Sequence, residues 1–102
     1  MKSNKPKILV FSDWYLPGHR AGGPITSMAN LFRNLATYVE FKLVCSDRDY
    51  MTQEPYEHII PNTWIKRENI EVLYLSPQQL SKTAIKNIIK QHPGYTIYIN
   101  GI

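Results

Sequence analysis

Four short stretches of the chain are almost continuously apolar and rich in β-branched or aromatic side chains, which is typical of strands. None of them alternates cleanly between apolar and polar residues. Strands of that composition are usually buried on both faces, so the pattern favours a parallel sheet over a one-sided antiparallel sheet. The predicted strands are Lys7–Ser12, Phe41–Ser46, Ile70–Leu75 and Tyr95–Asn100.

Two segments between these strands have the apolar spacing of amphipathic helices. In Pro24–Val39, apolar residues recur at every third or fourth position. The second helix is predicted over Ser76–Gln91. Ser76 suits its N-cap, Pro77 its first helical position and Gln79 the last position of a capping box.

The order of these elements is strand, helix, strand, long connection, strand, helix, strand. Parallel strands joined by crossover helices form a doubly wound sheet. We therefore predict an α/β fold, a Rossmann-like parallel sheet of about four strands with flanking helices, as one unit over residues 1–102. The connection Asp47–Asn69 shows no clear periodicity, and we expect one helical turn at Thr63–Arg67. Such a long connection is typical of a binding loop or of a segment packed over a sheet edge.

The composition argues against a coiled coil, a membrane-spanning protein and a secreted protein. Hydrophobic residues make up 43% of the chain, enough for a core, and seven scattered prolines argue against a coiled coil. The apolar run Ile8–Phe11 is too short for a membrane span or a secretory signal. Cys45 is the only cysteine, so we expect a reducing, cytoplasmic setting with a buried, inert thiol.

The net charge of +4 includes a row of lysines at every fourth position of the second predicted helix. Such a row is most often a solvated helix face. It is also compatible with a peripheral contact at the inner face of a membrane, with nucleic acid or with a phosphorylated ligand. No nucleic-acid motif accompanies it, so no nucleic-acid partner is predicted. The three residues are Lys82, Lys86 and Lys90.

The segment Phe11–Ser27 joins the first strand to the first helix, at the carboxyl edge where open α/β sheets bind ligands. Gly22 and Gly23 stand directly before the helix. Backbone N–H groups at a helix N-terminus, together with the helix dipole, form an anion site suited to phosphate or diphosphate. Arg20 adds a nearby positive charge. The alternative is that the two glycines only make a tight turn into the helix.

The sequence gives little support for a dinucleotide-binding, nucleotide-binding or metal site. Neither the dinucleotide fingerprint G-x-G-x-x-G nor a P-loop occurs. His19, His58 and His92 are scattered, and Cys45 has no partner at metal-ligand spacing. We predict neither a metal site nor a bound cofactor.

Three runs of sequence follow one another at the start of the chain: ILVFSDWYLPG, AGGPITSMANLFRNLA and FKLVCSDRD. They contain a Tyr-x-Pro segment, paired glycines, a helix of small and apolar residues, and an acidic residue after the second strand. The positions concerned are Tyr15, Pro17, Gly22, Gly23, Ser27, Leu31 and Asp47. In this order they resemble the start of a family 4 glycosyltransferase of the GT-B fold. The run YTIYINGI is similar to the fourth strand of that family.

The resemblance implies that the chain is part of the N-terminal domain of a retaining glycosyltransferase involved in polysaccharide biosynthesis. Such an enzyme transfers a sugar from a nucleotide diphosphate sugar to a glycan or lipid-linked acceptor. Members of the family have two Rossmann-like domains, and the second holds most of the donor nucleotide. The paired glutamates of the second domain have no counterpart here. The 102-residue chain alone is therefore expected to be inactive.

The resemblance also suggests site residues. The N-terminal domain of the family faces the acceptor, and its glycine loop reaches toward the donor diphosphate. Carried over to this sequence, the candidate diphosphate-binding residues are Gly22, Gly23 and Arg20, and the acceptor-side or loop candidates are Asp13, Tyr15 and Ser27. No catalytic residue can be named. The alternative function is a stand-alone, non-enzymatic α/β module that binds an anionic ligand or a protein partner.

The last predicted strand also bears on association. Tyr95–Asn100 contains neither lysine nor proline, the residues that usually protect a sheet edge. In a doubly wound sheet this strand would lie beside the first strand with its other side open. We therefore expect a homodimer formed at or near this strand, by edge pairing or by exchange of the segment from Ser76 onward.

Overall fold

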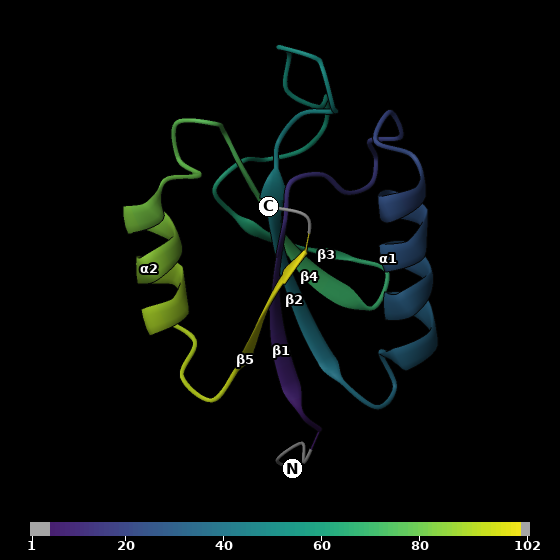
Figure 1. Ribbon diagram of the computed structural model, residues 1–102, viewed down its shortest axis with the longest axis vertical. Helices are drawn as coiled ribbons and strands as arrows, with labels where there is room; N and C mark the ends of the chain where they lie inside the picture. The colour runs from purple at the N-terminus through teal and green to yellow at the C-terminus, as the bar shows by residue number, and fades with distance from the viewer. Residues whose placement is uncertain (1–4, 101–102) are drawn as a thin grey trace.

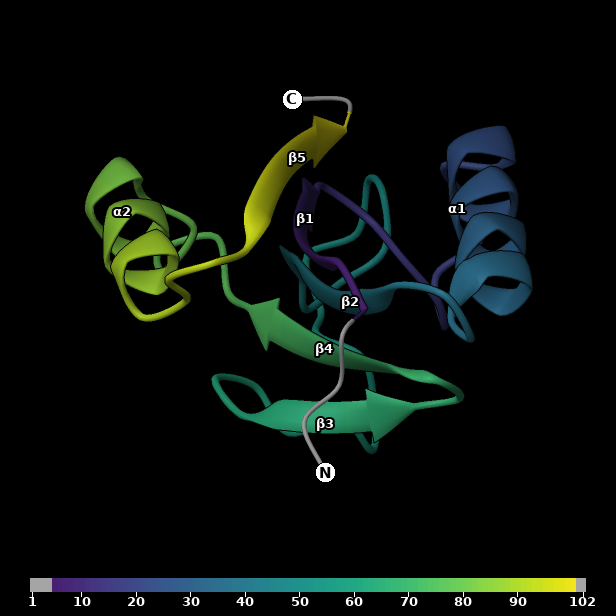
Figure 2. The ribbon, with the colours of Figure 1, turned by 90° about the horizontal axis from the view of Figure 1, so that it is seen from below.

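The computed structural model describes residues 5–100, which form a five-stranded sheet with one helix on each face (Figures 1 and 2). In chain order the elements are β1 (Lys7–Ser12), α1 (Gly23–Leu35), β2 (Glu40–Ser46), β3 (Trp64–Arg67), β4 (Ile70–Leu75), α2 (Lys82–Lys90) and β5 (Thr96–Asn100). The strand order is β3-β4-β2-β1-β5, and all neighbours except β3 and β4 are parallel. The predicted α/β class and the four predicted strands are confirmed.

The central strands are covered on both faces, which explains their nearly continuous apolar sequences. On one face, Val10 of β1 shares a core layer with Phe32 of α1. On the other face, Phe11 shares a second layer with Ile88 of α2. Figure 2 shows the two helices on opposite sides of the sheet. Cys45 of β2 is fully buried, as expected, and burial raises the pKa of its thiol.

The helical turn predicted at Thr63–Arg67 is wrong, because Trp64–Arg67 forms β3 and pairs antiparallel with β4. Only Glu68 and Asn69 separate the two strands, which is the length of a tight β-hairpin. Glu68 has a φ of 55°, and positive φ values are typical of such turns. Part of the connection Asp47–Asn69 therefore covers a sheet edge, one of the two roles expected for it.

The first helix is confirmed but ends earlier than predicted. Its apolar side, including Met28 and Phe32, is buried against the sheet. The helix ends at Leu35 rather than at Val39, because the backbone turns there. The N–H groups of Tyr38 and Val39 both donate to the carbonyl of Leu35, and the chain then enters β2.

The second helix begins at Lys82 rather than at Ser76. Ser76 and Gln79 do form one of the two capping-box bonds, in which the Ser76 N–H donates to Gln79 Oε1 over 3.4 Å, and the Ser76 hydroxyl also donates to this oxygen over 2.9 Å. These residues belong to a separate turn before the helix, in which the Gln79 N–H donates to the Ser76 carbonyl. The helix itself has a different N-cap, Ser81. The Ser81 hydroxyl oxygen accepts the N–H of Ala84 at 3.1 Å. A second serine, directly before the continuous helical segment, therefore determines where α2 starts.

The last strand lies beside β1 at the edge of the sheet, as predicted. Its register runs from Ile8 opposite Thr96 to Ser12 opposite Asn100. Because β1, β2, β4 and β5 are parallel, their carboxyl ends lie at one end of the sheet. The segment between β1 and α1 and the connection after β2 therefore meet at this end, at the top of Figure 1.

Two tyrosines fix the segment that follows β1. The Tyr74 side chain is fully buried in β4, and its hydroxyl donates to the carbonyl of Leu16. The Tyr56 hydroxyl donates to the carbonyl of Tyr15 over 3.3 Å. Burial raises the pKa of both hydroxyls, so they remain protonated donors. These bonds hold the backbone after β1 against the sheet and against the long connection.

We expect Tyr74→Phe to lower the free energy of unfolding by about 1–2 kcal/mol, because the half-buried carbonyl of Leu16 loses its donor. Urea denaturation measures this difference. Tyr38→Phe is the matched control, since Tyr38 is 69% exposed and its substitution should change stability by less than ~0.5 kcal/mol. Equal stability of the Tyr74→Phe and Tyr38→Phe variants would contradict the role given to the Tyr74 hydroxyl.

Candidate functional site

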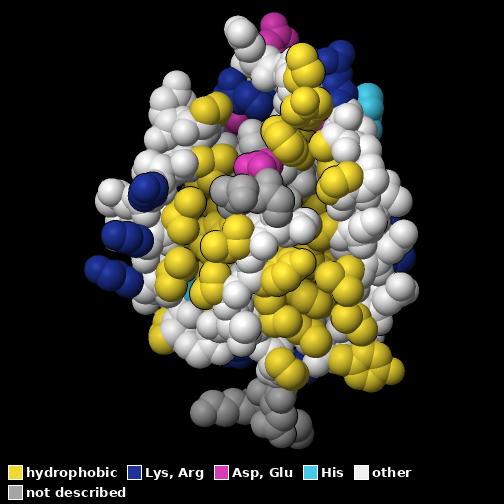
Figure 3. Space-filling model, viewed as in Figure 1, with side chains coloured by type: hydrophobic (Ala, Val, Ile, Leu, Met, Phe, Trp, Pro, Cys, Tyr) yellow, Lys and Arg dark blue, Asp and Glu magenta, His cyan; other side chains and the backbone are white. Residues whose placement is uncertain are grey.

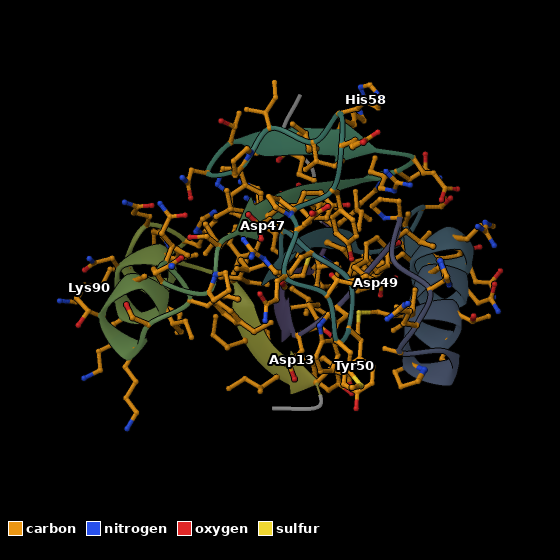
Figure 4. All side chains as sticks on the ribbon, turned by 90° about the horizontal axis from the view of Figure 1, so that it is seen from above. Asp13, Asp47, Asp49, Tyr50, His58 and Lys90 are labelled. Atoms are coloured by element: carbon orange, nitrogen blue, oxygen red, sulfur yellow. The ribbon has the colours of Figure 1, made fainter. Side chains whose placement is uncertain are left out.

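A pocket of about 420 Å³ lies where the carboxyl ends of β1 and β5 meet the N-terminus of α1. Figure 4 looks onto this end of the sheet and shows Asp13 and Tyr50 close together beside the end of β5. Open α/β sheets bind ligands at this position. The polar and aromatic side chains that line the pocket include Asp13, Trp14, Arg20, Tyr50 and Asn100.

One wall of the pocket is aromatic. The ring centroids of Trp14 and Tyr50 lie 4.8 Å apart with an interplanar angle of 75°, an edge-to-face contact. Asp13 shares the pocket with them, and burial raises the pKa of its carboxyl above 3.8. An aromatic surface beside a carboxyl and the amide of Asn100 is suited to a ligand that has both apolar faces and hydroxyl groups.

Ala21 and Pro24 line the pocket, and the glycine pair lies between them in the chain without lining it. Gly22 has a φ of 72°, a conformation that favours glycine, and its N–H donates to a carbonyl of the preceding turn. Pro24 has no N–H, and the N–H of Ile25 donates to the carbonyl of Gly22. Within residues 5–100, the Gly23 N–H therefore stays available at the start of α1. The predicted anion site is reduced to this one backbone donor and the Arg20 side chain.

Arg20 lies in a segment that is held by Asp49 of the long connection. The Asp49 carboxylate accepts the backbone N–H groups of His19 and Arg20 at 3.1 Å and that of Tyr50 at 2.8 Å. Its side chain is only 12% exposed. Burial alone would raise the pKa of Asp49, but the three N–H donors outweigh it and the pKa is lowered below 3.8. The carboxylate thus joins both loops that close the pocket.

Gly18 allows this close approach of the two loops. A Cβ atom at Gly18 would lie 2.3 Å from the Tyr56 hydroxyl and 2.9 Å from Asp49 Oδ1. Contacts that short are not tolerated, so any larger residue would push the loops apart. The glycine of the Tyr-x-Pro-Gly sequence therefore has a packing role.

Two candidate residues do not reach the pocket. Tyr15 is buried in the core against Phe32, and burial is the main reason that its pKa rises to about 12. Ser27 lies on α1 and lines a different, apolar groove toward β5. The pocket therefore brings Asp13 and Arg20 together, whereas the glycine pair only adjoins its lining residues Ala21 and Pro24 in the chain, and Tyr15 and Ser27 lie outside it.

Trp14 was not among the predicted site residues, and three residues from outside the segment Phe11–Ser27 were missed as well. Asp49 follows β2 at the ligand-binding end of the sheet, and this position could have pointed to it. Asn100 ends β5 directly opposite Ser12, which only the strand register reveals. Nothing in the sequence pattern distinguishes Tyr50 from the rest of its connection.

Comparisons of the chain with models of protein families, with curated proteins and with solved structures find no match. Among residues 5–100, no three His, Cys, Asp or Glu side chains are placed to hold a metal ion together. Neither helix of this part of the chain is long and apolar enough to span a membrane. Functional inference therefore depends on the chemistry of the pocket and on the sequence resemblance.

Asp49→Ala should lower the free energy of unfolding by about 1–3 kcal/mol, because backbone N–H groups lose a charged acceptor. The amides of His19 and Arg20 should also exchange faster with solvent. Urea denaturation and hydrogen exchange measure the two effects. Unchanged protection of both amides would contradict the proposed role of the carboxylate.

The same interaction has a defined pH dependence. Because the pKa of Asp49 is lower in the folded chain, its contribution to stability is complete above 3.8 and disappears as the pH falls through the lowered value. Asp49→Asn removes this titration. The stability difference between the original chain and Asp49→Asn should therefore shrink between about pH 4 and pH 2. A difference that stays constant over that range would contradict the assignment.

Proposed function

We propose that this chain is the N-terminal portion of a retaining, GT-B-fold glycosyltransferase of family 4. The complete enzyme would transfer a sugar from a nucleotide diphosphate sugar to a glycan or lipid-linked acceptor. The observation that carries the proposal is the division of the pocket into two walls. Arg20 belongs to one wall, with the Gly23 N–H three residues further along the chain at the start of α1, and Trp14 and Tyr50 form the other wall.

The first wall is suited to an anion. The Gly23 N–H lies at the positive end of the α1 dipole, where negative charge is stabilised. Arg20 has no ion-pair partner among the described residues, so its guanidinium is free to bind a phosphate oxygen. A diphosphate offers several oxygens to these donors at once.

The second wall is suited to a sugar. Sugar rings have apolar faces that pack on aromatic side chains, and the Trp14–Tyr50 pair provides such a surface. The Asp13 carboxyl and the Asn100 amide can form hydrogen bonds with hydroxyl groups. A donor diphosphate and an acceptor sugar would therefore occupy adjacent parts of one pocket.

The pocket supports binding rather than a complete reaction. Asp13 is its one carboxylate, and no histidine or cysteine lines it within residues 5–100. In enzymes that the chain resembles, the second domain supplies most of the donor site. We expect the 102-residue chain to show no sugar transfer above the uncatalysed rate, because charge stabilisation at the leaving diphosphate would be incomplete. Robust turnover by the purified chain would overturn this expectation.

A second candidate function, a non-enzymatic module for an anionic ligand, would use only the Arg20 side chain and the Gly23 N–H. Nuclear magnetic resonance separates the two functions, with inorganic diphosphate and a short oligosaccharide as probes. The glycosyltransferase proposal predicts that diphosphate shifts the Gly23 amide and that the oligosaccharide shifts the indole N–H of Trp14. Binding of diphosphate alone would favour the module, and no shift with either probe would exclude both functions.

Two glycine variants test the anion wall. No atom lies within 4 Å of a Cβ built on Gly23, so Gly23→Leu should fold while its side chain obstructs the N–H. We expect diphosphate binding to weaken at least ~5-fold, the loss of about 1 kcal/mol. Gly22→Ala should instead lower the free energy of unfolding by about 1–2 kcal/mol, because of the positive φ. Arg20→Gln should weaken binding about as much as Gly23→Leu.

Titration calorimetry and urea denaturation give the binding and the folding readouts. If Gly23→Leu lost stability in proportion to its loss of binding, the glycine pair would be only a tight turn before the helix. Unchanged binding in both Gly23→Leu and Arg20→Gln would exclude an anion at this wall.

A further inference from the structure

Two residues that line the candidate pocket from different segments share a single hydrogen-bonding partner. Arg20 belongs to the segment before α1, and Tyr50 belongs to the connection after β2. Within residues 5–100, every hydrogen bond that Arg20 or Tyr50 forms has the Asp49 carboxylate as its acceptor. In Figure 4, Asp49 lies toward α1 and Tyr50 lies toward Asp13. The carboxylate is therefore the common support of the two halves of the pocket.

One oxygen of this carboxylate makes the link. Oδ1 of Asp49 accepts the N–H of Arg20 at 3.1 Å and the N–H of Tyr50 at 2.8 Å. Oδ2 accepts the N–H of His19 at 3.1 Å, so the carboxylate cannot rotate without losing a hydrogen bond. Water has little access to these bonds, because the Asp49 side chain is mostly buried. Sheltered, charge-assisted bonds are strong, so the backbones of Arg20 and Tyr50 are held at a fixed separation.

The side chains of Arg20 and Tyr50 have much less support than their backbones. Tyr50 is 40% exposed, and its ring contacts Trp14 edge to face. Arg20 is exposed and has no ion pair within residues 5–100. Figure 3 shows hydrophobic side chains at this end of the molecule, with Lys or Arg side chains on either side of them. A ligand bound by either side chain therefore restricts a segment that the fold holds mainly through Asp49.

We propose that Asp49 is a positioning residue that couples anion binding at Arg20 to the order of the aromatic wall at Tyr50. The inference rests on the proposed function for its anion, a diphosphate held by Arg20 and the Gly23 N–H. When the anion fixes the Arg20 segment, the shared carboxylate is fixed too, and the Tyr50 backbone loses conformational freedom. A sugar that packs on Trp14 and Tyr50 then meets a wall that is already ordered, so its binding costs less entropy.

Coupling between two binding events is reciprocal, so a sugar at the aromatic wall should also tighten the binding of diphosphate. This direction suits a transferase, since donor and acceptor must be present together before sugar transfer can begin. The alternative is that Asp49 only stabilises the folded chain. A purely structural carboxylate would support both walls equally with and without the anion. A coupling carboxylate determines how the aromatic wall responds when the anion binds.

Nuclear magnetic resonance on the full 102-residue chain, with inorganic diphosphate as the only probe, separates these two roles. The Gly23 amide reports the anion directly, and hydrogen exchange of the Tyr50 amide reports the order of the aromatic wall. In the original chain, saturating diphosphate should shift the Gly23 signal and slow exchange at Tyr50 at least ~5-fold. In Asp49→Ala, diphosphate should still shift Gly23 but leave exchange at Tyr50 unchanged.

Two further variants make the test specific. Asp49→Asn keeps one carbonyl oxygen as an acceptor but loses the charge, so the slowing at Tyr50 should fall at least ~2-fold. Glu54→Ala is the matched charge control, since Glu54 is exposed on the same connection and forms no hydrogen bond or ion pair within residues 5–100. It removes the same charge and should keep the full response. Circular dichroism checks folding, and Asp49→Asn decides the question if Asp49→Ala does not fold.

The outcomes distinguish the coupling from the proposed function. A Gly23 shift without slower exchange at Tyr50 in the original chain would overturn the coupling and leave the proposed function intact. Undiminished slowing in the Asp49 variants would also overturn it, because another path would then link the walls. So would an equal loss of response in Glu54→Ala, which charge alone would explain. No shift at Gly23 would exclude the anion site, and the coupling with it.

Discussion

Burial of β1 and β2 on both faces is the constraint from which the other features of the molecule follow. Parallel strands cannot be joined by tight turns, so each pair needs a crossover, and the two crossover helices cover opposite faces of the sheet. The carboxyl ends of the strands then lie at one end of the sheet. Every side chain of the candidate pocket reaches it from a segment that leaves or enters the sheet at this end.

The pocket depends further on contacts between segments that are distant in sequence. Asp49 holds the backbone of His19 and Arg20, and Gly18 leaves room for it. The Tyr74 hydroxyl, from β4, holds the carbonyl of Leu16. These interactions turn a segment without regular structure into a fixed wall, since each backbone group is bound to a residue of the sheet or of the long connection. Within residues 5–100, the Arg20 guanidinium and the Gly23 N–H keep donors free for a ligand.

The sequence predicts the parts of this structure that depend on local pattern. Continuous apolar runs identify β1, β2, β4 and β5, and the glycine pair before α1 directs attention to the segment after β1. β3 could not be recognised, because four residues containing Lys66 and Arg67 show no apolar period. Its strand conformation comes from pairing with β4. The start of α2 was misplaced because Ser76 and Ser81 are both suitable caps, and only the backbone path separates them.

Only the part of the candidate site that comes from one continuous segment could be predicted from the sequence. Gly22, Gly23, Arg20 and Asp13 lie within one segment, so local sequence is enough to group them. Tyr50 and Asn100 come from other segments and meet Asp13 only through the strand order. The number of free N–H groups at the glycine pair was overestimated, because the N–H of Gly22 already donates to the carbonyl of His19.

The central claim is that the Arg20 side chain and the Gly23 N–H at the start of α1 bind a diphosphate. A crystal structure of the chain grown with inorganic diphosphate tests it most directly. The account predicts the anion in the pocket, within hydrogen-bond distance of the Gly23 N–H and of the Arg20 guanidinium. An occupied site only along the exposed lysines of α2, with an empty pocket at millimolar diphosphate, would contradict it.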